Sequence, residues 1–444
     1  MLQIHGNYYT DPKIKYIRSS KRNNAGQAQL NFGILTKDVK ISKRDFVAVT
    51  FLSSGTLAWF FLFFTNFENI FTQNLTVDFF WAYVGKAVFL TFAALSAIIG
   101  SMTSRRISLR KLMAYWVALG IFATASLAIF QGLFFSLLIS GLLGISFGLG
   151  YPICFGFLAD CTNVEERGRV AGAVFVEGFI LVFLAYVVSA IFNFGTTETI
   201  LLSVVLRSIS LPALAIVSPR KEQVRESSWR SVFGNKNFIL YLVPWIMFNI
   251  ASGLYTFVWY WIHQLPNFAE YIWAIDTGNV LHALMPAVFA FIAGIAADRL
   301  GRKQPVIFGM IMLGVSFGFL GLFTSPDSVL FYMTISGVAW GFLMAVYATV
   351  AGDVAHGESK EKFYALSTIL PLIINMSLNG VADFFGVGID ARTLSSVLSI
   401  ILFASVIPVL RAAETLPETK IKERKLSEHL KKVGELVEET RKAE

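Results

Sequence analysis

Apolar runs of about 20 residues, each long enough to cross a bilayer, alternate with short polar turns along most of this chain of 444 residues. Because hydrocarbon offers the backbone no hydrogen-bond partner, such a run crosses the membrane as a helix. The expected fold class is therefore an all-α membrane protein with twelve transmembrane helices. The predicted spans are about 45–65, 79–100, 112–130, 132–157, 170–192, 198–217, 238–263, 278–297, 305–324, 328–350, 364–385 and 393–411.

Composition excludes several other classes of protein. Apolar residues make up 55% of the chain and charged residues 15%, which differs strongly from the usage of a soluble domain. The net charge of +8 comes from basic residues between the apolar runs, so no nucleic-acid partner is expected. The two cysteines, Cys154 and Cys161, predict neither a disulfide framework nor a metal site. Dinucleotide, P-loop and zinc-protease motifs are missing, so we expect no cofactor and no enzyme.

Basic residues concentrate on one side of the predicted topology. Of the 37 lysines and arginines, 34 fall in the N-terminal segment, alternate loops, the central linker or the tail, while the opposite loops hold only Arg392. Because these residues favour the cytoplasmic side, both termini are expected in the cytoplasm, and the chain in the plasma membrane. The predicted domains are a cytoplasmic N-terminal segment (1–44), a first six-helix half (45–217), a cytoplasmic linker (218–237), a second six-helix half (238–411) and a charged cytoplasmic tail (412–444).

The two halves resemble each other at a fixed spacing. Gly100 and Gly294 are 194 residues apart, and Asp160 and Asp353 are 193 residues apart. A repeat of this length predicts two parallel six-helix pseudo-repeats. Small residues let helices approach closely in lipid, so we interpret the glycines of the repeat as packing residues. The spacing of 193 also relates Gly144 and Gly148 to Gly337 and Gly341.

The turn after the eighth predicted span reads Gly-Ile-Ala-Ala-Asp-Arg-Leu-Gly-Arg-Lys. It resembles, at every defined position, the loop signature Gly-x-x-x-Asp-Arg-x-Gly-Arg-Lys of the major facilitator superfamily. The resemblance implies a secondary transporter that works by alternating access, and a gating role in which Asp298 braces the loop against a neighbouring helix end. Topology signalling by the charges is the alternative. The motif residues are Gly294, Asp298, Arg299, Gly301, Arg302 and Lys303.

The first-half copy of this loop departs from the signature, because Ser104 stands where the acid is expected. Its bases are then expected to pair elsewhere, and the charged loop after the fourth span is the nearest candidate. A solvated charged loop is the alternative. The residues of these predicted inner-loop ion pairs are Arg105, Arg106, Glu165, Arg167 and Arg169.

Three ionisable residues lie inside predicted spans, where a charge at mid-membrane costs at least about 2.5 kcal/mol. Glu177 and Arg207 have similar depths on adjacent spans, which predicts an ion pair; the alternative is a substrate or proton role for Glu177. Lys86 has no acidic partner at its depth, which predicts either contact with an anionic substrate or snorkelling to the interface. His282 titrates near neutrality but is expected to be interfacial.

Polar and aromatic residues of the other spans are candidates for lining a substrate site: Trp59, Asn249, Tyr255, Trp340, Tyr347 and Asn375. We expect the substrate to be a small polar organic solute, a sugar or an organic acid, with protons as a possible coupling ion and the bilayer as surroundings. A multidrug-type exporter of the same fold is one alternative, and a non-transporting receptor or scaffold is another.

Overall fold

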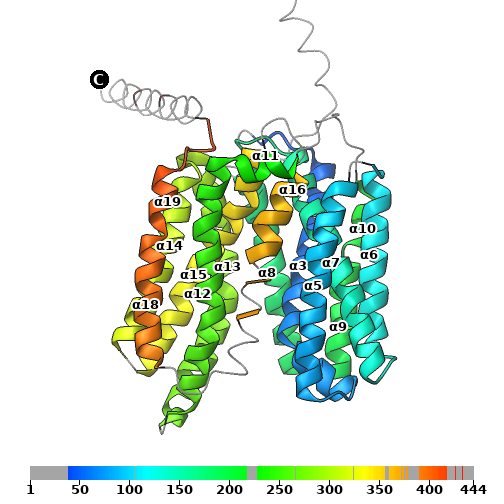
Figure 1. Cartoon of the computed structure of the whole chain (residues 1–444), viewed down its shortest axis with the longest axis vertical. Helices are drawn as coiled ribbons and strands as arrows, with labels where there is room; N and C mark the ends of the chain where they lie inside the picture. Colours follow the sequence, from blue (N-terminus) through cyan, green and yellow to red (C-terminus); the bar gives the residue numbers. More distant parts are fainter. Residues whose placement is uncertain are drawn as a thin grey trace, which may run out of the picture.

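The computed structural model describes residues 39–104, 106–217, 228–265, 267–323, 325–355, 360–371, 373–374, 377–378, 390–417, 426 and 433. Across these residues all regular secondary structure is helical. Figure 1 shows two groups of helices side by side, with most helices running between the same two ends of the molecule.

The first group contains the helices from Lys43 to Ile216. Ser42 caps its first helix, because the Ser42 hydroxyl accepts a hydrogen bond of 3.0 Å from the Asp45 amide. The helices are α3 (Lys43–Thr65), α4 (Phe67–Asn69), the π-helix η1 (Ile70–Asn74), α5 (Phe79–Thr103), α6 (Leu109–Ser126), α7 (Leu133–Cys161), α8 (Arg167–Ile191), α9 (Thr196–Ser208) and α10 (Leu211–Ile216).

The second group begins after the predicted linker 218–237, of which the structure describes α11 (Trp229–Gly234) and the start of the next helix. A capping box of Ser325 and Ser328 begins α15 at Pro326. The helices of this group are α12 (Lys236–His263), η2 (Phe268–Tyr271), α13 (Ile272–Leu300), α14 (Lys303–Leu322), α15 (Pro326–Val354), α16 (Glu361–Tyr364), the π-helix η3 (Ala365–Ile369), α18 (Ala391–Ala404) and α19 (Val406–Arg411).

Ten segments of the described chain are long and apolar enough to cross a membrane. The predicted third and eleventh spans are not among them. The third is the helix α6, whose first turn carries Arg110 and Lys111 and is therefore less apolar. The eleventh, 364–385, lies largely outside the described residues. Multi-pass architecture is thus confirmed, and the count of twelve stays a prediction.

The sequence repeat has a spatial counterpart in two similar helix pairs. In the first group α7 packs against α5, and a Cβ atom on Gly148 would lie 2.0 Å from the Ala93 carbonyl oxygen. In the second group α15 packs against α13, and a Cβ atom on Gly341 would lie 2.8 Å from the Pro286 carbonyl oxygen. These glycines therefore permit close helix packing in both groups, as the sequence predicted.

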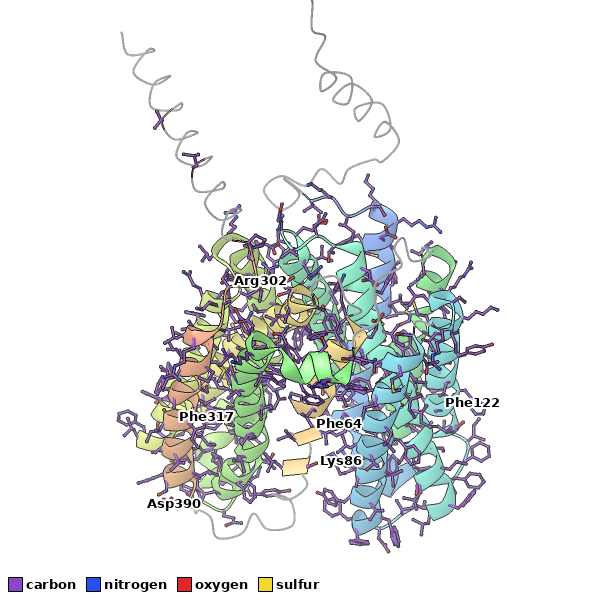
Figure 2. All side chains as sticks on the ribbon, turned by 45° about the horizontal axis from the view of Figure 1, so that its top comes forward. Phe64, Lys86, Phe122, Arg302, Phe317 and Asp390 are labelled. Atoms are coloured by element: carbon purple, nitrogen blue, oxygen red, sulfur yellow. The ribbon has the colours of Figure 1, made fainter. Side chains whose placement is uncertain are left out.

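Large apolar side chains cover the outer surface of the bundle. Phe122 on α6, for example, is 64% exposed and points outward in Figure 2. Exposed apolar side chains of this kind suit contact with lipid. We call the end of the bundle that carries the loop Gly301–Arg302 the motif end, and the opposite end the cavity end; they lie at the top and bottom of Figure 1.

Candidate functional site

The two groups of helices approach each other most closely where α13 crosses α8 near the motif end. A Cβ atom on Gly294 would lie 2.3 Å from the Gly168 carbonyl oxygen and 3.2 Å from the Cα atom of Gly172. Seven residues later, Gly301 ends α13 with a φ of 97°, a left-handed conformation that other residues adopt only with strain. Both glycines of the motif loop therefore have a steric reason to be glycine.

Asp298 joins the motif loop to the N-terminus of α8. One of its carboxylate oxygens accepts hydrogen bonds from the Gly168 amide (2.8 Å) and Arg302 (3.1 Å). The other accepts from the Arg169 amide (2.9 Å) and guanidinium (3.1 Å). A carboxylate at a helix N-terminus satisfies free amides and complements the helix dipole. Asp298 therefore holds α13 and α8 together.

Arg302 and Asp353 extend this contact into a buried network. The Arg302 guanidinium contacts Asp353 (2.8 Å) and Asp298, and it also donates to the Val164 carbonyl oxygen of the first group. Asp353 pairs in turn with Arg167 from the start of α8. Burial favours a lower pKa for Arg302, but Asp353 and Asp298 outweigh burial and hold its pKa above the usual value. The network therefore keeps its charges paired.

Two further contacts fasten the motif end. Lys360 donates to the carboxylate of Asp160 (2.9 Å) and to the Ala159 carbonyl oxygen (2.7 Å) at the end of α7. Burial lowers the pKa of Lys360, and its ion pair with Asp160 opposes this change. Glu414, after the last helix, accepts hydrogen bonds from the amides of Arg302 (2.7 Å) and Lys303 (3.2 Å), and so caps α14.

The sequence reasoning did not foresee two partners of the inner-loop charges. Arg167 pairs with Asp353 and Arg169 pairs with Asp298, and both of these acids belong to the second group. Arg106 is exposed, and Arg105 lies outside the described residues. The reason is that the start of α8 faces the other group of helices, where buried carboxylates are better partners than the exposed first-half loop.

Of the remaining predicted loop residues, Glu165 is half-buried, and its backbone carbonyl accepts a hydrogen bond from Arg169 (3.3 Å). Arg299 is exposed, and Lys303 donates to the Leu410 carbonyl oxygen (2.9 Å). Among the motif bases, it is Arg302 that forms an ion pair with Asp298.

An aromatic layer lies between the network and the centre of the molecule. Phe155 on α7 has its ring 5.9 Å from that of Phe175 on α8 and 5.9 Å from that of Tyr364 on α16, so it contacts both groups of helices. Trp245 and Tyr347 stack at 4.4 Å beside it, and the Tyr347 hydroxyl donates to the Tyr241 carbonyl oxygen (2.8 Å). These rings leave only a narrow gap between the groups.

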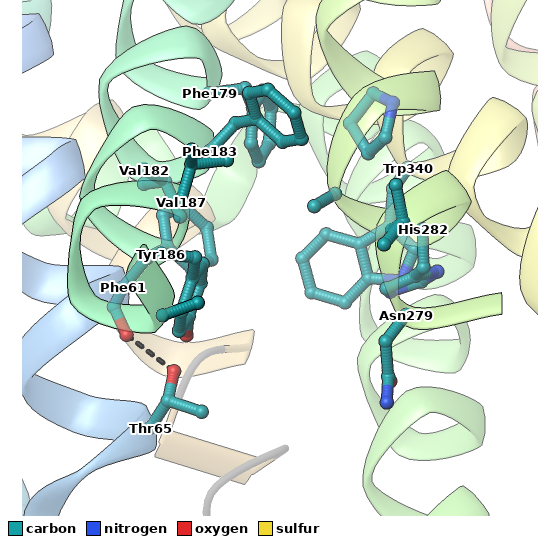
Figure 3. A pocket seen from close by; sticks show the side chains of 14 residues that line it. Phe61, Thr65, Phe179, Val182, Phe183, Tyr186, Val187, Asn279, His282 and Trp340 are labelled. Carbon is teal, nitrogen blue, oxygen red and sulfur yellow. Dashed lines mark hydrogen bonds between the residues drawn. The ribbon is translucent and has the colours of Figure 1, made fainter. Parts of the chain in front are cut away.

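A cavity of about 700 Å³ lies on the other side of this layer, toward the cavity end. Figure 3 shows one wall formed by α8 with Phe61 and Thr65 of α3, and a facing wall formed by α13 with Trp340 of α15. Aromatic and aliphatic side chains dominate the lining, and its polar side chains are few. Among the described lining residues, the polar ones are Thr65, Tyr186, Asn279 and His282.

One of the six predicted lining residues, Trp340, is among the described residues that line the cavity. Trp59 is buried in the first group and donates to the Thr124 hydroxyl (3.0 Å), while Asn249 donates to the Trp245 carbonyl oxygen (2.7 Å). Tyr255 stacks on Tyr332, Tyr347 belongs to the aromatic layer, and Asn375 lies outside the described residues. Polar and aromatic character alone therefore selected mostly packing residues.

The expectation that Lys86 lacks a partner was wrong. Its ammonium group pairs with the carboxylate of Glu68 and lies 4.7 Å from the centre of the Phe64 ring. Glu68 belongs to α4, a short helix that packs against α5 in a segment predicted to be a loop. Lys86 is also not among the described residues that line the cavity, so it offers no free charge to a substrate there.

Glu177 and Arg207 do not form the predicted pair either. Arg207 is fully buried among Thr56 (2.7 Å), Ser146 (3.1 Å) and the rings of two tryptophans, Trp59 and Trp116. Glu177 accepts a hydrogen bond of 3.2 Å from Ser54. The two side chains project from different faces of their helices, so similar depth did not bring them together.

The position of Glu177 on α8 also separates it from the cavity. It shares a helical stripe with the exposed side chains of Ile180, Leu184 and Ile191, which are three, seven and fourteen residues further on. The lining residues of α8, such as Phe179 and Phe183, lie on the opposite side of the helix. Glu177 therefore does not face the described cavity.

The predicted position of His282 was wrong. It was expected at an interface, and it lies instead in the cavity wall. A sequence signal was present, because Asn279, His282, Ala283 and Pro286 follow the spacing of one helix face.

The described helices thus form two groups that are fastened at the motif end and enclose a cavity toward the other end. The crystal structure of the human organic anion transporter MFSD10 (TETRAN) is similar over 82% of this chain and 99% of that chain, with a TM-score of 0.59 and 15% sequence identity. The chain is accordingly a multi-pass helical membrane protein with the fold of that structure.

One curated relative matches part of the sequence. The cis,cis-muconate transport protein of Acinetobacter baylyi is 25% identical over 138 residues, which is 30% of this chain. The matched part of the chain spans a third of that relative's length (33%). No family model matches the chain.

Proposed function

We propose that this protein is a secondary transporter that carries a small organic acid with an apolar body across the plasma membrane by alternating access. The observation that carries the proposal is the pairing of a cavity between the two groups of helices with a buried ion-pair network that closes the motif end. In this scheme the motif end is cytoplasmic, both termini lie there, and the described conformation is open to the outside.

The ion-pair network acts as the inner gate in this proposal. Asp298, Asp353 and Lys360 each bind a residue of the first group, so opening the motif end must break all three contacts. Because separating buried ion pairs one at a time would leave uncompensated charges, all three contacts break together when the gate opens. A gate with this property gives two discrete conformations, which alternating access requires.

The lining favours an organic acid over a sugar. A sugar brings several hydroxyl groups, and each hydroxyl buried without a partner costs about 1–3 kcal/mol. Four polar side chains among the described lining residues are too few for such a substrate, whereas Phe61, Phe179, Phe183 and Trp340 suit a flat apolar body. The two similar proteins, an organic anion transporter and a cis,cis-muconate transport protein, support the same chemistry by their names.

Reconstitution of the full chain in liposomes tests the proposal. Uptake would be compared for terephthalate, cis,cis-muconate, glucose and tetraphenylphosphonium, with and without an imposed pH gradient. We expect saturable uptake of the two dicarboxylates and none of glucose. Preferential transport of tetraphenylphosphonium would instead indicate a multidrug-type exporter, and binding of a carboxylate without transport would indicate a receptor.

A further inference from the structure

Contacts of one ring nitrogen, Nδ1, hold His282 in the cavity wall. Its Nδ1 atom lies 3.1 Å from the Met333 carbonyl oxygen and 3.2 Å from the Ser336 hydroxyl, both on α15. The ring also meets Trp340 edge to face, with centroids 6.5 Å apart. Figure 3 shows the imidazole beside Trp340 and Asn279 on the wall that faces α8.

These contacts assign the hydrogen atoms of the ring. A carbonyl oxygen only accepts, so Nδ1 must carry a hydrogen to bond with Met333. The Ser336 hydroxyl also donates to the Met333 carbonyl oxygen (3.1 Å). The other ring nitrogen, Nε2, forms no hydrogen bond with any residue that the structure describes. Nε2 is therefore the atom that gains or loses a proton.

The described surroundings of His282 contain no charged group that would pair with a protonated imidazole. No ion pair involves His282 within the described residues, and the described lining contains neither lysine nor arginine, aspartate nor glutamate. Tyr186 on α8 and Tyr332 on α15 are titratable groups of the facing elements, while Glu177 lies on the far side of α8. Glu270 of η2 and Asp276 of α13 are exposed, and on α14 the charged residue is Lys303 at the motif end.

We propose that His282 is the proton-coupling and carboxylate-binding residue of the cavity. The inference rests on the proposed function and specifies how a carboxylate is recognised. Nε2 takes up one proton from the cavity end, and the resulting N–H donates to one carboxylate oxygen of the substrate. After the cavity closes and the motif end opens, the carboxylate and the proton leave together on the cytoplasmic side, and the imidazole returns neutral.

Coupling follows from the apolar lining. A lone imidazolium or a lone carboxylate is strongly disfavoured in an apolar cavity, but an imidazolium and one carboxylate group together form a charge-assisted hydrogen bond in which these two charges cancel. Each therefore raises the affinity of the other, and this linkage is reciprocal. Protonated His282 also provides a positive charge at the cavity, which Lys86 does not provide. This charge forms when a carboxylate substrate binds.

The substitution His282→Asn tests the assignment with little disturbance. The Asn amide group keeps a donor that can reach the Met333 carbonyl oxygen, and it removes the titratable Nε2. His263→Asn is the matched control, because His263 has the same kind of contact, Nδ1 to the Trp259 carbonyl oxygen at 2.8 Å, but is not among the described lining residues. Both variants would be reconstituted as full chains beside the wild type.

Uptake of radiolabelled terephthalate by the wild type is expected to rise about ten-fold between pH 7.5 and pH 5.5, because an imidazole changes charge in this interval. The His263→Asn variant should behave alike. The His282→Asn variant should bind terephthalate at least ten-fold more weakly and respond less than two-fold to pH. Its affinity for the neutral analogue terephthalamide should be unchanged, which would show that the cavity is intact.

Two experimental outcomes would refute the role of His282, and one of them would also refute the proposed function. If the wild type transports the dicarboxylate and His282→Asn keeps the same pH response, the role of His282 is refuted while the proposed function stands. If the wild type transports no carboxylate, the proposed function and this inference fail together.

Discussion

The substitution Asp298→Asn gives the sharpest test of the buried network at the motif end. Asp298 is 1% exposed, and its two carboxylate oxygens each accept two hydrogen bonds. An Asn side chain offers one oxygen and one NH₂ group. Whichever way the amide turns, its NH₂ group must face two donors, and the two charge pairs with Arg169 and Arg302 are lost.

The magnitude follows from these contacts. Two charge-assisted hydrogen bonds are worth roughly 1.5–3 kcal/mol each, so the closed motif end loses at least about 3 kcal/mol. The bonds from Gly168 and Arg169 cross between the two groups and are made in the closed conformation, whereas the Arg302 bond lies within the second group. Loss of the bonds that cross therefore shifts the conformational equilibrium rather than unfolding the protein. A change of about 3 kcal/mol alters the ratio of closed to open molecules about 150-fold.

Cysteine labelling measures this shift directly. Thr368 lies in the narrow gap of the aromatic layer, and Thr368→Cys would be placed in a background in which both native cysteines are Ser. In inside-out membrane vesicles, a membrane-impermeant maleimide should label this residue slowly in the otherwise unchanged protein. Asp298→Asn should accelerate labelling by at least ten-fold and reduce transport severely.

A control and a refuting result complete the test. Ser104→Ala changes the equivalent position of the first-half loop, where the Ser104 hydroxyl donates a hydrogen bond of 3.3 Å to the Ser101 carbonyl oxygen. It should alter neither labelling nor transport. Equal labelling rates in the Asp298→Asn variant and its parent would refute the view that this carboxylate holds the motif end closed.

Three other substitutions follow from the corrected contacts. Lys86→Met should lower thermal stability by about 1–3 kcal/mol because Glu68 loses its partner, and the double variant with Glu68→Gln should recover most of the loss; an effect on terephthalate affinity would contradict the assignment. A double-mutant cycle of Glu177→Gln and Arg207→Gln should give additive stability changes within about 0.5 kcal/mol, and a larger coupling energy would restore the ion pair. Gly294→Val places a side chain against α8, so it should keep the motif end open in the labelling assay; labelling as slow as in the parent would show that the crossing can widen.

Much of the fold could be predicted because its signals are local. The length of each apolar run predicts a spanning helix, and each of the ten candidate spans of the described chain agrees with a predicted one within a few residues at both ends, apart from Phe268–Leu300, for which the predicted start is 278. The motif loop could also be predicted from the sequence, because the left-handed turn at Gly301 and the close approach at Gly294 each require a glycine. These features depend on chemistry within one or two turns of helix.

Contacts between segments that are far apart in the sequence could not be predicted in this way. Arg167 and Asp353 are 186 residues apart, and only the packing of α8 against the second group makes them neighbours. Glu68 is near Lys86 in the chain, but no sequence pattern indicated that a short helix would fold back beside α5. Partner choice depends on which faces meet, and a charge pattern alone does not contain that information.

The cavity was the hardest feature to predict, for a related reason. Sequence reasoning selected polar and charged residues inside spans, whereas the described lining is mainly apolar. The rotation of each helix about its axis decides which residues line the cavity: on α8, Phe179 and Phe183 face it and Glu177 faces away. The sequence by itself determined a multi-pass helical protein with a gate-like loop. Only tertiary packing decided the helix rotations, and with them which charges are paired and that His282 lines the cavity.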